Sequence, residues 1–219
     1  QLDVDRLYYL TRDSFFTGVN EGVISHDRIL KMLDVYDGKL VVEQKGIYSI
    51  ESFLISRRLM YWQVYLHKTV LCAEMMLIKA MERAKELAKK GFDLPCTDAL
   101  KYFLYNDFSI ANFAGNTLEM FAQLDDNDVL SALKYWKNNP DPILSFLSNA
   151  LLNRNLFQIR QIESSRNDLK MQELKVSNSF GCNVEDASFL VFDLTIRHAA
   201  YDIQNDKILI INKDNAREK

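Results

Sequence analysis

The stretch from residue 51 to residue 90 contains neither glycine nor proline, and Gly91 follows it directly. Because these two residue types interrupt helices most strongly, the stretch predicts one uninterrupted helix. At about 1.5 Å per residue this helix would be about 60 Å long, which is longer than most helices of globular proteins. A helix of this length predicts a mainly helical domain built around it.

Shorter elements are predicted on both sides of the long helix. Asp3 suits the N-cap of a first helix that reaches about Phe16, and a short helix follows over residues 26–34. Residues 40–43 and 47–50 have the pattern of the two strands of a small β-hairpin. Beyond Gly91, start signals of Asp, Asn, Thr or Pro predict helices near residues 97–105, 117–124, 126–138 and 142–154.

The pattern changes near Asn155. Residues 156–162 alternate between apolar and polar as a strand does, and two further strands are predicted over residues 189–196 and 207–211. A helix is predicted near residues 167–176. We therefore expect a mainly α fold in two parts. The first is a helical bundle with a long central helix and a small hairpin over residues 1–154, and the second is a small α+β subdomain over residues 155–219.

Charge and cysteine content limit the classes of function. The chain has 27 Lys and Arg against 30 Asp and Glu, with a net charge of −3, so no general polycationic surface is available for nucleic acid or an anionic membrane. Any phosphate binding must therefore be local. Cys72, Cys96 and Cys182 lack CxxC spacing, which is typical of reduced thiols in a cytosolic protein. No apolar run of about 18 residues is present, and we expect a cytoplasmic location without membrane or nucleic-acid partners.

Two helical faces carry residues suited to chemistry. On the first predicted helix, Asp5, Tyr9 and Asp13 lie within an arc of roughly 80°, and Arg6 flanks it. Carboxylates suit hard divalent cations, and the planar donor fork of Arg suits phosphate oxygens. The same spacing also fits an ordinary solvated face whose acidic residues complement the helix dipole.

The long predicted helix repeats this theme. Arg57, Tyr61, Tyr65 and Lys68 are spaced four, four and three residues apart and share one stripe. Two cations and two phenols on one line could hold an anionic, planar ligand. The alternative is core packing of the aromatic rings, with the cationic tips reaching water.

Two sequence blocks resemble the HD superfamily of metal-dependent phosphohydrolases, of the deoxynucleoside triphosphate triphosphohydrolase type. Residues 2–14, LDVDRLYYLTRDS, are similar to the family block L-D-[VA]-D-[RK]-[LMW]-D-Y-x-x-R-D, and residues 17–19 continue it. Residues 60–70, MYWQVYLHKTV, are similar to a second block with a Y-x-H-K core, which an Arg precedes by eight residues. The resemblance is strongest over residues 1–90 and weaker to about residue 160.

The resemblance implies a divalent metal ion, such as Mg, Mn, Fe or Zn, held by a His, a His-Asp pair and a later Asp. The later Asp falls on Asp5, which would be a metal ligand and a catalytic residue. Arg6 would then lie near the substrate phosphates. The His and the His-Asp pair are expected to precede Gln1.

The remaining site residues follow from the same two blocks. The resemblance places Tyr9 beside the sugar of the substrate and makes Asp13 the acceptor for its 3′-hydroxyl. It places Arg57 at the triphosphate and Tyr65 at the nucleoside end. Lys68 matches a family lysine that is associated with a regulatory nucleotide site.

One residue departs from the family pattern, and the histidines present do not replace the missing ligands. Tyr8 stands where the family usually has Asp, which implies a lost supporting contact and changed activity or selectivity. His26 is followed by Asp27, but this pair opens a helix after the first block, and N-capping accounts for the Asp. His67 and His198 lack partners at metal-ligand spacing and are expected to be structural.

Three functions stay open from the sequence. The first is a phosphohydrolase that cleaves deoxynucleoside triphosphates to nucleoside and tripolyphosphate, with these 219 residues inactive by themselves. The second is a degenerate, nucleotide-binding regulatory member of the family, and the third is an oligomerisation module. The expected partners are a nucleotide substrate, a nucleotide activator and further copies of the chain in a dimer or tetramer.

Overall fold

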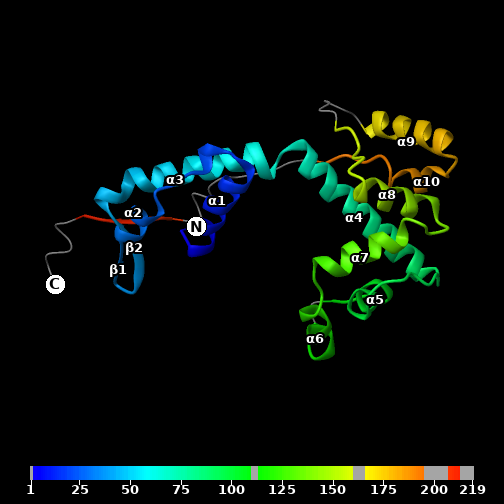
Figure 1. Cartoon of the computed structure of the whole chain (residues 1–219), viewed down its shortest axis with the longest axis horizontal. Coiled ribbons are helices and arrows are strands. Elements are labelled where there is room, and N and C mark those ends of the chain that lie inside the picture. Colours follow the sequence, from blue (N-terminus) through cyan, green and yellow to red (C-terminus); the bar gives the residue numbers. More distant parts are fainter. Residues whose placement is uncertain (1, 110–112, 160–165, 195–206, 213–219) are drawn as a thin grey trace. The chain divides into compact units, whose positions relative to one another are not determined.

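Helices form most of the chain, and one small sheet accompanies them (Figure 1). The computed structural model describes residues 2–109, 113–159, 166–194 and 207–212. Its contacts divide the chain into two compact units, one of residues 1–70 and 196–219 and the other of residues 71–195. The prediction of a mainly α fold with a small β part is confirmed.

The first unit combines three helices with the sheet. Its helices are α1 (Val4–Thr17), α2 (His26–Lys31) and α3 (Ile47–Met60), its strands are β1 (Leu33–Tyr36), β2 (Lys39–Glu43) and β3 (Leu209–Ile211), and its shorter turns are η1 (Asn20–Gly22), η2 (Gln44–Gly46) and the π-helical η3 (Tyr61–Tyr65). The strand order is β1-β2-β3, with β1 antiparallel and β3 parallel to β2. Asp3 caps α1 as predicted, because its carboxylate accepts the N–H of Arg6 at 2.8 Å.

The predicted hairpin was wrong in one of its strands. The partner of β2 is β1, which precedes it, and the two strands meet across Asp37 and Gly38, both with positive φ. This Asp-Gly pair suits a tight two-residue hairpin turn. Residues 47–50 instead begin α3. Gly46 stands before them for packing reasons, since a Cβ there would lie 2.8 Å from side-chain atoms of Met32 and Val42.

The predicted single long helix was also wrong, because it is interrupted. α3 runs into the wider π-helical turn η3, where the N–H of Leu66 donates to the carbonyl of Tyr61 at 2.7 Å. A new helix, α4, then runs from Lys68 to Lys89. The imidazole of His67 accepts the N–H of Thr69 at 3.3 Å and so satisfies a donor at the start of α4. Neither Gly nor Pro marks this break.

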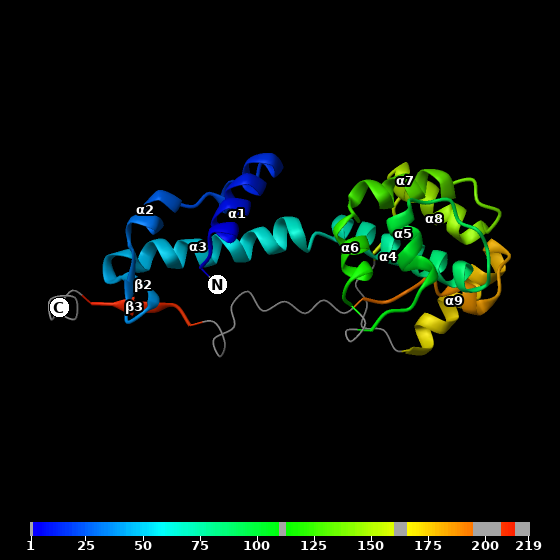
Figure 2. The same ribbon diagram turned by 90° about the horizontal axis from the view of Figure 1, so that it is seen from below.

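The core of the first unit lies between α1, α3 and the sheet. Helix α1 lies against α3 in both views (Figure 1, Figure 2). Buried apolar side chains from these elements and from α2 fill the space between them, and they are Leu7, Leu10, Ile24, Ile29, Val42, Ile50, Phe53 and Met60. This core fixes how α1 and α3 face each other.

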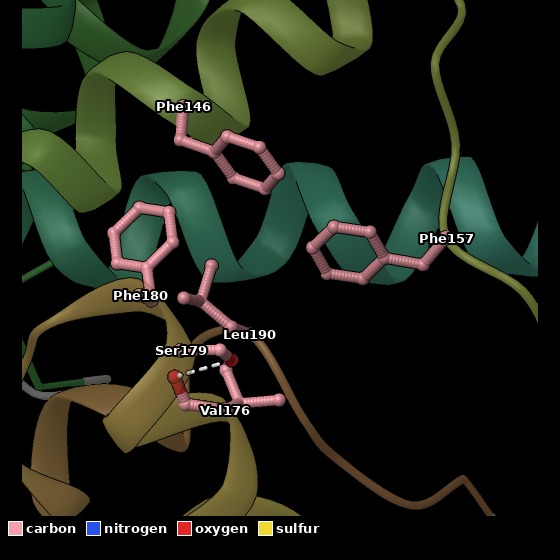
Figure 3. A pocket seen from close by; sticks show the side chains of 6 residues that line it. All are labelled: Phe146, Phe157, Val176, Ser179, Phe180 and Leu190. Atoms are coloured by element: carbon pink, nitrogen blue, oxygen red, sulfur yellow. Dashed lines mark hydrogen bonds between the residues drawn. The ribbon is translucent and has the colours of Figure 1, made fainter.

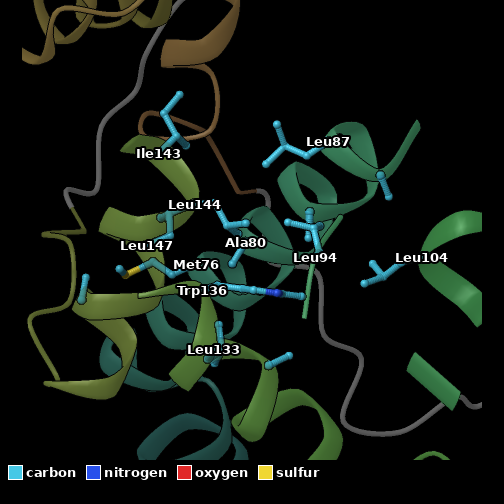
Figure 4. Packing of buried hydrophobic residues seen from close by; sticks show 14 of the residues in the cluster. Met76, Ala80, Leu87, Leu94, Leu104, Leu133, Trp136, Ile143, Leu144 and Leu147 are labelled. Atoms are coloured by element: carbon cyan, nitrogen blue, oxygen red, sulfur yellow. The ribbon is translucent and has the colours of Figure 1, made fainter. Parts of the chain in front are cut away.

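The second unit is helical in all its described elements. It contains most of α4, with α5 (Asp98–Tyr105), α6 (Asn116–Ala122), α7 (Asp126–Trp136), α8 (Pro142–Leu152), α9 (Arg166–Phe180) and α10 (Val184–Ala187). Trp136 is fully buried among Met76, Leu144 and Leu147 and their neighbours (Figure 4). The predicted helices in this region are confirmed, each within a few residues.

Two of the predicted strands do not form within the described residues. Over residues 156–159 the backbone of Phe157 bonds to side chains of α4, donating to the Met76 sulfur at 3.4 Å and accepting from Cys72 at 3.1 Å. Over residues 189–194 the chain continues as turns after α10. Residues 160–162 and 195–196 lie outside the described part of the chain. The third predicted strand is confirmed by β3.

The two units divide the chain differently from the expected boundary after Arg154. Leu156 and Phe157 pack on the core of the second unit together with Phe189 and Phe192, whereas β3 joins the sheet of the first unit. Within the part of the chain that is described, no helix is both long enough and apolar enough to span a membrane. Cys72, Cys96 and Cys182 are free thiols.

Candidate nucleotide site

Five side chains of the first unit form one connected group. Tyr9 and Asp13 come from α1, Arg57 comes from the last turn of α3, and Tyr61 and Tyr65 come from η3. We call these five residues the Tyr–Arg cluster. Four of them were predicted as site residues from two separate blocks of the sequence, and the packing of α1 against α3 brings the two blocks together.

Asp13 receives two hydrogen bonds from its neighbours. The hydroxyl of Tyr65 donates to Oδ2 at 2.8 Å, and Nε of Arg12 donates to Oδ1 at 3.0 Å. Burial raises the pKa of Tyr65 well above its usual value, and the hydrogen bond to the Asp13 carboxylate raises it further. Tyr65 therefore stays protonated around neutral pH and can act as a donor.

Arg57 places a positive charge inside the cluster. Only 9% of its surface is exposed, and its guanidinium lies over the ring of Tyr61, 5.4 Å from the centroid. It also lies close enough to the hydroxyl of Tyr9 to act on the pKa of that phenol. Burial raises the pKa of Tyr9, and the neighbouring Tyr61 adds to this, while Arg57 opposes both. Tyr9 is thus a neutral phenol that faces a fixed cation.

The three tyrosine rings meet edge to face. Tyr65 lies 5.1 Å from Tyr61 and 6.1 Å from Tyr9 between ring centroids, with interplanar angles of 73° and 74°. Rings held in this way form rigid apolar walls with polar tips. A wall of this kind beside a cation and a carboxylate suits a ligand that combines a flat or cyclic part with an anionic part.

The other predicted residues lie outside the cluster. Asp5 is exposed on the first turn of α1. Arg6 pairs with Asp3 at 3.2 Å through Nε, while its Nη1 is shielded from solvent and has no hydrogen-bond partner among the described residues. Lys68 is the exposed first residue of α4. The break before α4 interrupts the helical spacing that placed Lys68 on one stripe with Tyr65.

Tyr8, the departure from the family pattern, makes a contact of its own. The side chain is 64% exposed, and the guanidinium of Arg12 lies over its ring at 5.4 Å from the centroid. Arg12 is thereby held between the Tyr8 ring and the carboxylate of Asp13. Position 8 carries Tyr instead of Asp, and the carboxylate that pairs with Arg12 is that of Asp13.

Tyr61 was predicted from helical spacing as part of the stripe that could hold a ligand, but the family resemblance gave it no role. Its contact with Arg57 joins residues four positions apart, as that spacing predicts. Helical spacing alone could not separate a site residue from a packing residue here. The proximity of Tyr61 to Tyr9 depends on how α1 packs against α3.

The described residues do not complete a metal site. They contain no group of three His, Cys, Asp or Glu side chains that could hold an ion. Asp5 offers one carboxylate, and a bound divalent ion would need further ligands. His26 pairs with the adjacent Asp27 at 3.3 Å, and both side chains are exposed. His198 lies outside the described residues.

A pocket in the second unit lacks the groups that chemistry would need. Its volume is about 240 Å³, and three phenylalanine rings turn toward it beside Leu190 (Figure 3). The polar side chain in its lining is Ser179, whose hydroxyl donates to backbone carbonyls of its own helix at 2.9 and 3.2 Å. The pocket therefore offers apolar contact and no converging polar groups.

Comparisons with known proteins agree with an HD-type assignment. Residues 24–99, which include Arg57, Tyr61 and Tyr65, match the family model of the HD associated region. The crystal structure of a phosphohydrolase from Bacteroides thetaiotaomicron is similar to the chain, with a TM-score of 0.90 and 51% sequence identity, over 98% of this chain and 54% of that one. Residues 24–99 thus match an HD associated region, and the chain is similar to a phosphohydrolase along nearly its whole length.

Curated relatives extend this picture. The uncharacterized protein YwfO of Bacillus subtilis is 34% identical over 195 residues, which is 88% of this chain and 43% of that protein. A deoxynucleoside triphosphate triphosphohydrolase SAMHD1 homolog of Dictyostelium discoideum is 30% identical over 88 residues, which is 40% of this chain and 17% of that protein. The chain spans about half the length of its first relatives or less.

Proposed function

We propose that the full-length protein containing this chain is an HD-type, metal-dependent phosphohydrolase that cleaves deoxynucleoside triphosphates to nucleoside and tripolyphosphate. The observation that carries the proposal is the Tyr–Arg cluster. Two sequence blocks predicted its residues separately, and they meet in one group that combines a buried guanidinium, tyrosine rings and a carboxylate. The names of the Bacteroides phosphohydrolase and the Dictyostelium triphosphohydrolase support the same class of reaction.

Each member of the cluster has a proposed role that follows from its chemistry. Arg57 binds the triphosphate, because its planar donor fork matches phosphate oxygens and its position is fixed. Asp13 accepts the hydrogen bond of the sugar 3′-hydroxyl in place of Tyr65. Tyr9 packs beside the sugar, and the ring of Tyr65 faces the nucleoside end. Arg6 assists at the phosphates with its unbonded Nη1.

Metal chemistry belongs to the full-length protein in this proposal. Asp5 supplies one ligand to a divalent ion, and the other ligands come from residues outside this chain. When bound, such an ion would activate water for attack on phosphorus. Residues 1–219 by themselves are then expected to bind nucleotide weakly and to hydrolyse none.

The decisive experiment compares the full-length protein with its Asp5→Asn variant and with residues 1–219 alone. Each is incubated with the four deoxynucleoside triphosphates and a divalent metal, and tripolyphosphate and nucleoside are quantified. We expect turnover by the full-length protein, a loss of at least about a hundredfold in Asp5→Asn, and none by the short chain. Asn keeps the shape of Asp, and Asp27→Asn, which changes an exposed carboxylate of α2 outside the cluster, is a matched control that should change activity little.

Three outcomes would contradict the proposal. These are release of pyrophosphate or inorganic phosphate instead of tripolyphosphate, full activity in Asp5→Asn, and chelator-sensitive turnover by residues 1–219. The last of these would mean that the site has been misplaced.

A second function is favoured by one observation. Tyr8 replaces a family acidic residue and stacks with Arg12, so a member that binds nucleotide as a regulator without cleaving it is the runner-up. Nucleotide-dependent thermal stabilisation of a full-length protein that shows no turnover would favour this alternative. A homo-oligomer, a cytoplasmic location and a regulatory nucleotide near Lys68 complete the proposal.

A further inference from the structure

Tyr61 connects parts of the cluster that come from different elements. Its ring lies under the guanidinium of Arg57 at 5.4 Å, and its edge-to-face contact with Tyr65 joins the centroids at 5.1 Å. Its hydroxyl also lies close enough to that of Tyr9 on α1 to raise the pKa of the Tyr9 phenol. One residue thus contacts the proposed phosphate-binding, sugar-contacting and nucleoside-contacting side chains.

The position of Tyr61 in the backbone explains how it can do so. It is the first residue of η3, where the wider turn begins directly after α3. Wide π-helical turns of this kind often occur at functional sites. Here the turn begins four residues after Arg57, so the ring remains next to the guanidinium on the same side of the helix.

The two halves of the Tyr61 side chain have separable effects. The ring supplies the flat, electron-rich face on which a nearly buried guanidinium keeps a fixed orientation. The hydroxyl contacts the phenol of Tyr9, which burial keeps protonated. Replacing the ring should therefore let the Arg57 guanidinium change its orientation, whereas removing only the hydroxyl should let the Tyr9 side chain do so.

We propose that Tyr61 is a positioning residue that holds Arg57 for the phosphates through its ring and Tyr9 for the sugar through its hydroxyl. This inference rests on the proposed nucleotide function and assigns Tyr61 no contact with the reacting atoms. It predicts that phosphate binding and sugar selection depend on different parts of one side chain.

The test uses the full-length protein and two variants of this position. Inorganic tripolyphosphate is titrated calorimetrically, with a chelator in every sample so that metal complexes do not contribute. We expect Tyr61→Leu to weaken tripolyphosphate binding at least about tenfold and Tyr61→Phe to change it less than about twofold. Tyr48→Leu is the matched control, since Tyr48 is on the same helix α3, 82% exposed, and should bind as the wild type does.

The sugar arm uses the hydrolysis of paired deoxyribo- and ribonucleoside triphosphates. Tyr61→Phe should narrow the ratio of their kcat/KM values at least about threefold, because Tyr9 is no longer held. A purely structural role would lower both values together and leave the ratio unchanged. The rescue of phosphate binding by Phe, with altered sugar selection, is the signature that packing alone would not produce.

A double-variant cycle with Arg57→Met separates the loss of the contact between Tyr61 and Arg57 from a general loss of folding in Tyr61→Leu. In the Arg57→Met background, Tyr61→Phe and Tyr61→Leu should have no further effect on tripolyphosphate binding. Additive losses, or a Tyr61→Leu protein that binds as the wild type does, would overturn the inference alone. A wild type that binds neither tripolyphosphate nor nucleotide would overturn the proposed function and this inference with it.

Discussion

Arg83 of the second unit and Arg57 of the first are both nearly buried, with exposed fractions of 5% and 9%, and their described contacts are of different kinds. Arg83 binds Asp141 through two hydrogen bonds of 3.2 and 2.6 Å and Asp186 through a third of 2.6 Å. The described contact of Arg57 is with the ring of Tyr61, and its charge also acts on the phenol of Tyr9. The first arginine thus binds carboxylates that join helices, whereas the second lies among the aromatic side chains of the Tyr–Arg cluster.

This difference separates an arginine that holds a fold together from one that can receive a ligand. Burial acts to lower the pKa of Arg83, but the hydrogen bonds and charges of Asp141 and Asp186 outweigh it and raise the pKa above its usual value. Asp141 also caps α8 and Asp186 lies in α10, so Arg83 on α4 joins three helices. The guanidinium of Arg57 lies over the Tyr61 ring within the Tyr–Arg cluster, where its planar donor fork is suited to the phosphate oxygens of the proposed substrate.

The largest expected effect is the loss of stability when Arg83 is removed. Arg83→Met should lower the free energy of unfolding by about 3–5 kcal/mol, because two carboxylates are left without their cation in a largely buried place. Urea unfolding of the 219-residue chain, followed by the fluorescence of Trp136 in a Trp62→Phe background, measures it. Lys89→Met, an exposed change on the same helix, should cost less than about 0.5 kcal/mol.

The pH dependence of the stability loss in Arg83→Met tests whether that loss is electrostatic. Burial acts to raise the pKa of Asp141, but the hydrogen bond and charge of Arg83 outweigh it, and the net pKa is lowered from 3.8. A carboxyl group whose pKa is lower in the folded state than in the unfolded state stabilises the fold at a pH above its unfolded-state pKa. This stabilisation is lost as the pH falls through the folded-state pKa. The difference in the free energy of unfolding between the wild type and Arg83→Met should therefore shrink below about pH 3.8. A gap that is equal at pH 7 and pH 3 would mean that packing, not charge, is lost.

The next largest effect concerns ligand binding at Arg57. In the full-length protein, Arg57→Ala should weaken tripolyphosphate binding by about 1.5–3 kcal/mol, roughly ten- to a hundredfold, because a charge-assisted donor fork is removed. Binding of the unphosphorylated deoxynucleoside should change far less. Equal losses for both ligands would place Arg57 in the same structural class as Arg83 and remove the contrast between the units.

Local signals in the sequence were sufficient for most helices but not for these contacts. Thr97, Asp125 and Asp141 are N-caps, and their residue types are those that typically precede a helix. Helical spacing indicates the pairing of Arg83 with Glu86, three positions away, but Asp141 and Asp186 lie 58 and 103 positions away, where spacing carries no information.

The candidate site was predictable to a similar extent. Tyr9 with Asp13, and Arg57 with Tyr65, each share a stripe on one element, so each pair could be chosen from spacing and resemblance. The hydrogen bond from Tyr65 to Asp13 spans 52 positions and depends on how α1 packs on α3. The π-helical turn that presents Tyr61 has no Gly or Pro to mark it, so the sequence indicated Tyr61 only as one member of the stripe.

The selection between deoxyribo- and ribonucleotides is expected to change by about tenfold when Tyr9 is replaced. This change separates the proposed roles of Tyr9 and Asp13, which both lie on α1. If Tyr9 packs against the C2′ edge of the sugar, it leaves no room for a 2′-hydroxyl, whereas Asp13 reads the 3′-hydroxyl of either sugar. Tyr9→Ala should narrow the ratio of kcat/KM between deoxyribo- and ribonucleotides by about tenfold, a change of roughly 1.4 kcal/mol. Asp13→Ala should lower both values and keep their ratio. An unchanged ratio in Tyr9→Ala would return Tyr9 to core packing.

The smallest effect is expected for the hydrogen bond that a sugar hydroxyl would have to replace. Tyr65→Phe removes the donor to Asp13, but the Asp13 side chain is 25% exposed, so water can take the place of the lost hydroxyl. The free energy of unfolding should therefore fall by only about 0.5–1 kcal/mol, and Asp13→Ala combined with Tyr65→Phe should cost no more than Asp13→Ala alone. A loss of about 3 kcal/mol or more would mean that the bond is a structural contact like those of Arg83. Asp13 would then be unable to exchange the Tyr65 hydroxyl for that of a ligand at low cost, and the proposed route for reading the 3′-hydroxyl would fail.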